Sequence, residues 1–362
     1  MVETNKRILS IDTLRGLDFV WIMGIDSLLI ALAKAWPNAV TAFAGDQMVH
    51  VSVGLHFEDL IFPTFMFLSG CSWPFSMASR LGKGDSRGRI TLSILRRVLV
   101  MVTVGFLLCR VLSCLPAWQF PMGVRIHSLF GHIGFAWGVM ALVTLFVPRR
   151  WWLVGIGSYL VYLAFFLVWP DVNARFDAWL APGHLAGPAG STYELESFFS
   201  TNGSIPTAFL GYWAGDVIRR ADITGFAKTL RLLVAGVVCG ILGTLFWAFV
   251  MPCSKIDWNP TFILCSGSFA LLALAALYYV IDVRGVRAWT FPFKVIGMNA
   301  ILCYTLQNVI SFPSLAHRYF LMWTDLVGVP AAWVSVIDLG AGFILLWLLL
   351  YYCYRRKVFL RM

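Results

Sequence analysis

The chain is divided into about ten runs of mostly apolar residues, each close to 20 residues long. A helix needs about 20 such residues to cross the hydrocarbon core of a bilayer, where only helices or closed barrels satisfy their own backbone groups. The sequence therefore predicts an all-α polytopic membrane protein, with residues 1–362 as a single transmembrane domain. The expected spans lie near 14–36, 58–79, 98–117, 126–147, 151–169, 202–218, 232–251, 260–281, 292–312 and 331–354.

The composition excludes a water-soluble fold. Apolar residues fill 59% of the 362 positions and charged residues 13%, whereas a soluble domain is close to half apolar and a quarter charged. A soluble chain of this length has no way to bury the additional apolar surface, so we expect that surface to face lipid. The 16 Trp and 11 Tyr fit this class, because their rings favour the headgroup zone of a bilayer.

The distribution of Lys and Arg predicts the orientation. With the N-terminus in the cytoplasm, most basic residues outside the spans fall on the cytoplasmic side. The positive-inside rule then predicts two cytoplasmic termini and a multi-pass position in the cell inner membrane. The net charge of +10 comes from these short clusters, so we expect no nucleic-acid partner. The expected outer loops retain only Arg125, Arg175, Lys255 and Arg318.

Targeting and metal-binding signals are weak. The segment 1–10 is polar and leads into a full span, so we expect no cleavable signal peptide. The eight Cys are scattered singly without a C-x-x-C pair, and we therefore expect neither a zinc site nor a disulfide framework.

Ionisable residues interrupt the first apolar run. Such residues are costly inside a membrane and are candidates for function. Asp12 and Arg15 are three residues apart and share a helical face, which suits either an interfacial ion pair or a role in cofactor binding. Asp18 and Asp26 are eight residues apart, so we expect them to lie on one face as well.

A second polar cluster precedes the next apolar run. His50, His56, Glu58 and Asp59 follow one another closely, and Asp26 can approach from the neighbouring helix. A His oriented by a carboxylate is the usual arrangement of a general base or an activated nucleophile. The same residue types also suit a metal ion, or a purely structural network. The sequence leaves these three interpretations open.

Later polar residues are more isolated. Lys255 and Trp258 fall in the expected outer loop before the eighth span. Asn299 and Gln307 lie in the ninth apolar run, where buried amides either join helices or contact a ligand. The chain contains no P-loop, no G-x-S-x-G motif and no dinucleotide-binding fingerprint in the expected context.

Three blocks carry a resemblance to a known family. They are DTLRG at Asp12–Gly16, DLIFP at Asp59–Pro63 and GMN at Gly297–Asn299, in this order along nearly the whole chain. Together they resemble the heparan-α-glucosaminide N-acetyltransferase family and its bacterial relatives. The resemblance implies an enzyme that takes acetyl from cytosolic acetyl-CoA and places it on a terminal glucosamine amine across the membrane.

The resemblance also implies residue roles. His50 stands at the position of the catalytic His, and Asp59 opens the DLIFP block. Asp12, Arg15 and Asn299 are implied to line the acetyl-CoA cavity. The chain departs from the animal enzymes at Asp26, where they have Asn, and at Gln307, where they have His.

The remaining expectations concern ligands. We expect Asp26 or Asp59 to assist catalytic His50 as its electrostatic partner. We expect Gln307 to contact the acetyl donor together with the basic clusters at 80–97 and 284–294. We expect the acceptor, a saccharide, to contact His56, Glu58, Lys255 and Trp258.

Several alternatives stay open. His50 either carries the acetyl group transiently or deprotonates the acceptor. The acceptor is either an amine or a hydroxyl of surface polysaccharide or peptidoglycan. A proton-coupled transporter or flippase using Asp18, Asp26 and Asp59 is the rival class, although no internal repeat typical of many transporters is visible. A homodimer is compatible with the sequence.

Overall fold

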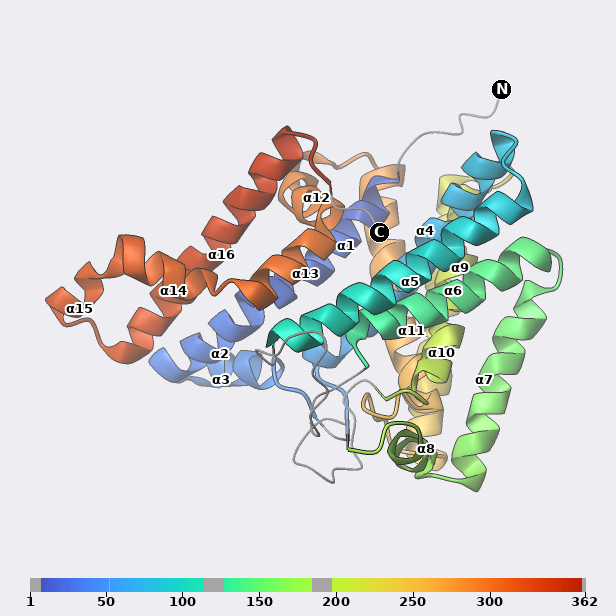
Figure 1. Ribbon diagram of the computed structural model, residues 1–362, viewed down its shortest axis with the longest axis horizontal. Helices are drawn as coiled ribbons and strands as arrows, with labels where there is room; N and C mark the ends of the chain where they lie inside the picture. The colour runs from blue at the N-terminus through green and yellow to red at the C-terminus, as the bar shows by residue number, and fades with distance from the viewer. Residues whose placement is uncertain (1–7, 52, 113–126, 184–196, 360–362) are drawn as a thin grey trace.

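The computed structural model describes residues 8–51, 53–112, 127–183 and 197–359, and in these ranges it is helical without a strand (Figure 1). Within them, eight helices are long and apolar enough to cross a membrane, which confirms a multi-pass membrane protein. The first is Leu9–Ala35, built from α1 (Leu9–Val20), the π-helix η1 (Trp21–Ile25) and α2 (Asp26–Ala35). The others are α4 (Phe57–Gly82), α5 (Arg87–Leu112), α6 (Leu129–Phe146), α7 (Trp151–Val168), α10 (Gly225–Phe249), α11 with η2 (Pro260–Leu277, Tyr278–Val283) and α16 (Ala331–Arg355).

Two of the expected spans differ from these eight. The run at 202–218 forms the continuous helix α9 (Thr201–Arg219), but its buried Ser, Thr and Gly residues make it less apolar than the others. The run at 292–312 is broken at Asn299 into α12 (Phe291–Met298) and α13 (Ala300–Val309). Both helices of the broken pair are too short to cross the hydrocarbon core alone.

The helix α9 lies inside the bundle and packs against α4, α6 and α7. Its small residues let the backbones approach closely. A Cβ on Gly211 would meet the carbonyl oxygen of Phe67, and one on Gly215 would meet that of Cys71. Close contact of this kind between small residues is the usual basis of helix packing in membranes, and it explains why a less apolar helix is placed here.

The C-terminal third packs on the first span. The helix α12 contacts both α1 and α16, while α14 (Phe312–Ala316) packs on α16. Figure 1 shows α14, η4 (His317–Leu321) and α15 (Trp323–Val327) at one end of the molecule and α7 at the other. The beginning of α1 and the end of α16 lie toward the same side in this view.

The first span is not a regular α-helix. Gly24 has φ 117° inside the π-helix η1, a conformation that favours glycine. The spacing of Asp18 and Asp26 across this irregular turn therefore does not follow α-helical geometry. Both carboxylates nevertheless lie within electrostatic range of Glu58 on α4.

Short helices cover the end of the bundle where α4 begins. They are α3 (Ala39–Asp46) before α4 and α8 (Val172–Leu180) after α7. The loop before α4 is joined to the loop between α10 and α11, because the backbone N–H of Gly54 donates to the carbonyl of Cys253 at 2.9 Å. Segments that are about 200 residues apart in the sequence thus meet at one end of the bundle.

Candidate active site

Asp59 connects the start of α4 to His50. It occupies the third position of the helix, where a carboxylate is stabilised by the free N–H groups and the helix dipole. Its Oδ2 accepts the backbone N–H of His56 at 3.1 Å, and its Oδ1 lies 2.9 Å from Nδ1 of His50. Asp59 is fully buried, so its orientation is fixed by these two contacts.

The Asp59 contact indicates which nitrogen of His50 carries a hydrogen. An ionised carboxylate only accepts hydrogen bonds, so in a neutral imidazole Nδ1 carries the hydrogen and Nε2 has the lone pair. The His50 side chain is 58% exposed, while its partner Asp59 is 0% exposed. The structure therefore brings together a buried carboxylate and an accessible imidazole, which is the geometry of a general base or a nucleophile.

Lys255 reaches the same place from the loop between α10 and α11. Its Nζ lies 3.1 Å from Nδ1 and 3.4 Å from Nε2 of His50, and 3.7 Å from Oδ1 of Asp59. The three side chains form one cluster although Lys255 is 205 positions from His50.

Glu58 shares a cavity with His50 and Lys255. The cavity has a volume of about 170 Å³, and its walls come mainly from the first span, α4, α6 and α13. The Oε2 atom of Glu58 is buried and has no hydrogen-bond partner within the described part of the chain. A buried carboxylate oxygen without a hydrogen bond lowers the stability of the fold, so an N–H or O–H group of a ligand would be favourable here. The remaining lining residues are Phe19, Ile22, Ile61, Phe62, Phe65, Leu129, Phe130 and Tyr304.

His56 is turned toward the preceding loop. Its Nδ1 lies 2.8 Å from the carbonyl oxygen of Val49, and its Nε2 lies 3.7 Å from Asp46 at the end of α3. It does not line the cavity that contains His50. These contacts hold the loop that carries His50.

Asp26 is close to the cluster but does not join it directly. Its carboxylate accepts the backbone N–H of Ser27 and lies within electrostatic range of His50 and Glu58. Within the described ranges, no hydrogen bond joins Asp26 to His50. Asp26 therefore brings a further carboxyl group near the cavity, while Asp59 is the carboxylate that contacts the imidazole.

Trp258 forms part of the support behind the cavity. It is 2% exposed and its Nε1 donates to Thr207 of α9 at 3.3 Å. Its ring packs edge-on against Phe62 at 4.9 Å between centroids, and Phe62 lines the cavity. The structure thus places Trp258 behind the wall and not among the residues that a ligand in this cavity would touch.

Two guanidinium groups lie deeper in the bundle. Arg15 of α1 donates to Ser72 of α4 at 2.7 Å and lies 3.5 Å from Asp12. Arg97 of α5 stacks on Trp137 at 4.1 Å, and the positive charge of Arg15 acts on it. The Nε atom of Arg97 is buried without a hydrogen-bond partner in the described residues. The sequence placed Arg97 only at the edge of a basic cluster, and no local signal marked it as a neighbour of Arg15.

Asn299 lies beside α1. It is fully buried at the break between α12 and α13, and neither side-chain atom has a hydrogen-bond partner in the described part of the chain. A Cβ on nearby Gly297 would meet the backbone carbonyl of Asp12, which shows how closely α12 approaches α1. Asp12, Arg15 and Asn299 therefore belong to one region of the bundle, around the contact between α1 and α12.

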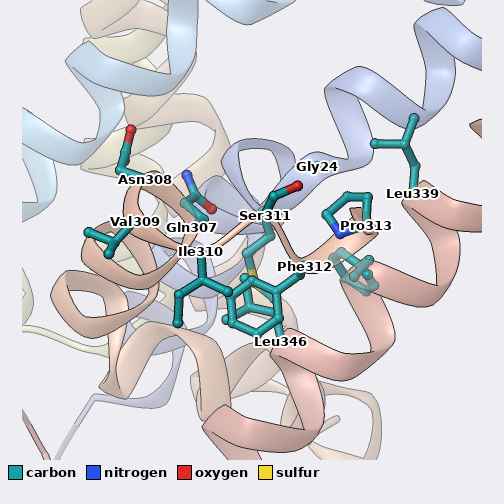
Figure 2. Close-up of a pocket in the computed structure, with 13 residues that line it drawn as sticks. Gly24, Gln307, Asn308, Val309, Ile310, Ser311, Phe312, Pro313, Leu339 and Leu346 are labelled. Atoms are coloured by element: carbon teal, nitrogen blue, oxygen red, sulfur yellow. The ribbon is translucent and has the colours of Figure 1, made fainter. Parts of the chain in front are cut away.

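Gln307 belongs to a different cavity. Figure 2 shows it beside Asn308, Ser311 and Gly24, in a space of about 350 Å³ between η1, α13, α14 and α16. The structure does not bring Gln307 together with Asp12, Arg15 and Asn299. This cavity lies next to that of His50, because Asn308 donates to the carbonyl of Tyr304, which lines the His50 cavity.

Metal binding finds no geometric support in the residues described. Among them, no group of three or more His, Cys, Asp and Glu side chains is placed to hold a metal ion. His50 and Asp59 face Lys255, and a cation at this position would be repelled by the ammonium group.

The chain is similar to curated proteins that share one name. No family model matches the chain. It is 26% identical to human heparan-alpha-glucosaminide N-acetyltransferase over 431 residues, which cover 98% of this chain and 59% of that protein. It is 25% identical to the mouse protein of the same name, over 85% of this chain and 54% of the mouse sequence. The chain spans just over half the length of these curated relatives. The chain is thus similar, over most of its own length, to the heparan-alpha-glucosaminide N-acetyltransferases.

Proposed function

We propose that the protein is a membrane-embedded acetyltransferase of the cell inner membrane, which uses cytosolic acetyl-CoA and a sugar acceptor on the periplasmic side. The observation that carries this proposal is the pairing of exposed His50 with buried Asp59 at 2.9 Å, inside a multi-pass bundle. The names of the two relatives support the reaction type, since both are N-acetyltransferases.

The donor would bind along the first span. Acetyl-CoA carries phosphate groups, and Arg15 and Arg97 offer two guanidinium groups that suit phosphate oxygens. The side-chain atoms of Asn299, which have no hydrogen-bond partner among the described residues, fit the polar amide arm of the same molecule. From Arg15 to Ile22, which lines the His50 cavity, α1 and η1 rise by roughly 10 Å, so one extended donor can contact both regions.

His50 supplies the chemistry at the other end. In one scheme, Nε2 removes a proton from the acceptor, whose nitrogen or oxygen attacks the thioester carbon; the carbon–sulfur bond breaks, and the proton on Nε2 passes to the departing CoA thiolate. In the other scheme, Nε2 itself attacks the thioester carbon and the carbon–sulfur bond breaks, releasing CoA thiolate; the acceptor then attacks the acetyl-imidazole, the nitrogen–carbon bond to Nε2 breaks, and the acceptor's proton passes to the thiolate. Both schemes use the lone pair of Nε2, the ring nitrogen that does not contact Asp59.

The charge around the cavity favours an amine over a hydroxyl acceptor. Among the residues that the structure describes, Asp26, Glu58 and Asp59 bring three carboxyl groups to this end of the bundle and Lys255 brings one ammonium group. A cationic amino sugar is attracted by such a site, whereas a neutral hydroxyl is not. We therefore favour the amine of a terminal glucosamine as the acceptor.

Transfer of labelled acetyl from acetyl-CoA to glucosamine or a glucosaminide tests the proposal on the full chain in detergent. His50→Ala should lower turnover by on the order of a hundredfold or more, the usual effect of losing a positioned acid–base group. His56→Ala is the comparison variant: its side chain does not line the cavity, so it should lower turnover much less than His50→Ala. Near-normal turnover in His50→Ala would contradict the assignment of His50, and absence of transfer to any amine or hydroxyl would contradict the proposed function.

A further inference from the structure

Lys255 is held in place by a loop with many hydrogen bonds of its own. Asn259 caps α11 by accepting the N–H of Phe262 at 2.9 Å, and its amide donates to the carbonyl of Pro252 at 2.6 Å. Ser254 donates to Asp257 at 2.8 Å. The backbone is thus fixed on both sides of Lys255. Placing the Lys255 side chain beside His50 therefore costs little additional backbone entropy.

The loop is also anchored to the surrounding helices. Tyr162 of α7 and Asn173 of α8 both donate to the carbonyl of Asp257, at 2.7 and 2.9 Å. The next residue, Trp258, adopts φ 48°, a conformation that non-glycine residues seldom adopt and that is kept only when the surroundings enforce it. Neighbouring elements therefore fix the backbone from which Lys255 extends.

The ammonium group of Lys255 acts on His50 mainly through its charge. Nδ1 of His50 already gives its hydrogen to Asp59, and a nitrogen that carries a hydrogen cannot accept a bond from Lys255. The Nζ atom lies at similar distances from both ring nitrogens, 3.1 and 3.4 Å, and its side chain is only 17% exposed. A positive charge this close disfavours protonation of the imidazole.

The other charges near His50 have the opposite effect. Asp59 and Glu58 face it from α4, and Asp26 faces it from the first span. Without a cation, the Asp59 carboxylate in contact with the ring would favour the imidazolium form, which has no lone pair for catalysis. Lys255 is the cation that the described part of the chain places in contact with both the imidazole and Asp59.

We propose that Lys255 is a positioning residue that keeps His50 in its neutral form at the pH at which the enzyme works. The inference rests on the proposed function, in which the neutral imidazole is the base or nucleophile. It assigns Lys255 to the reaction centre itself, in addition to any contact with the acceptor.

Chemical modification of His50 tests this without relying on transfer activity. Diethyl pyrocarbonate reacts with neutral imidazole, and mass spectrometry of the peptide containing His50 reports the rate at each pH for the intact protein. In Lys255→Met the pH of half-maximal reaction should rise by about one unit or more, the shift expected for removing a charge at this distance. Lys255→Arg should keep the parent profile. Lys34→Met, at an exposed lysine of α2, is the matched control.

The pH dependence of acetyl transfer gives the second measurement. The acidic limb of the Lys255→Met profile should move to higher pH by the same amount, while turnover at high pH stays close to that of the parent. Lys255→Met could instead raise the KM without shifting either the acidic limb of the activity profile or the pH dependence of His50 modification. That result would overturn the inference and leave Lys255 as an acceptor contact only. If the parent protein transfers no acetyl group, the proposed function fails, and the modification profile still decides the role of Lys255.

Discussion

The backbone carbonyl of Phe67 in α4 occupies the space where a side chain on Gly211 of α9 would begin. Gly211→Ala should therefore force the two helices apart and lower the free energy of unfolding by about 1–3 kcal/mol, the usual cost of overpacking. Thermal unfolding in detergent measures this. Gly157→Ala in α7 is the control, because an added Cβ there meets no atom within 4 Å. Equal unfolding temperatures for both variants would contradict the close α4–α9 contact.

This contact also shows what the apolar pattern predicted and what it did not. The long apolar runs predicted the spans, because lipid-facing residues must be apolar along the whole helix. The helix α9 is covered by α4, α6 and α7, so its composition reflects packing against protein and is only moderately apolar. The break at Asn299 was not predicted, because hydropathy does not register a local change of backbone direction.

The candidate site was predicted where its residues are close in sequence. His50 and Asp59 are separated by nine positions across the start of a helix, and a His followed by carboxylates indicated their pairing. Lys255 joins them from 205 positions away, a proximity that only tertiary packing creates. The same holds for Arg97 and Arg15. Gln307 was expected at the donor site because of the resemblance, but the kinked first span and the broken α12–α13 pair place it in another cavity.

Donor binding should depend on Arg97. Acetyl-CoA that binds only the folded protein raises its unfolding temperature by mass action. The Nε atom of Arg97 is buried and has no hydrogen-bond partner in the described residues, so we expect it to bind a phosphate group of the donor. Arg97→Gln removes this guanidinium group and should reduce the rise in unfolding temperature at a given acetyl-CoA concentration. Arg150→Gln, an exposed position between α6 and α7, should leave the rise unchanged. A thermal-shift series with both variants measures this, and an equal response to acetyl-CoA in the two would contradict the donor assignment.

The orientation in the membrane can be tested by labelling. We expect the loop that carries His50 to face the periplasm, because most Lys and Arg lie toward the opposite side. A Cys at exposed Val53 should react with a membrane-impermeant thiol reagent in whole cells, and a Cys at exposed Ser86 should not. The measurement uses a background without other reactive Cys. The reverse pattern would contradict the orientation and the transmembrane reaction with it.

The position of α15 relative to α16 should depend on pH through His317, which contacts one carboxylate on each helix. Hydrogen bonds to Asp338 at 3.1 Å and to Asp325 at 3.0 Å raise the pKa of His317 above its ordinary value of 6.5. A raised pKa in the folded state means that the protonated form stabilises the fold. This contribution is complete below about pH 6.5 and is lost as the pH rises through the higher folded pKa.

Hydrogen exchange of residues 317–327 measures this effect. After correction for its intrinsic pH dependence, the exchange rate should increase as the pH is raised above about 6.5, the ordinary pKa of His. His317→Gln should show no such pH-dependent change. A pH-independent protection in the parent protein would show that the His317 contacts do not hold α15 in place.

The substitution Asp59→Asn separates the two roles of Asp59. The amide oxygen of the new side chain can still accept the backbone N–H of His56, so the start of α4 should be preserved. The amide nitrogen would then face Nδ1 of His50 and act as a donor, which forces Nδ1 to accept and moves the ring hydrogen to Nε2.

The substituted protein should therefore fold normally but react slowly. We expect turnover to fall by on the order of a hundredfold, because the lone pair needed at Nε2 is lost. Asp59→Ala should show the same loss of turnover and, in addition, a lower free energy of unfolding by about 1 kcal/mol, since the helix start loses its carboxylate partner. Acetyl-transfer assays and unfolding curves on the two variants measure both effects. Full activity in Asp59→Asn would show that the contact between Asp59 and His50 does not orient the catalytic imidazole.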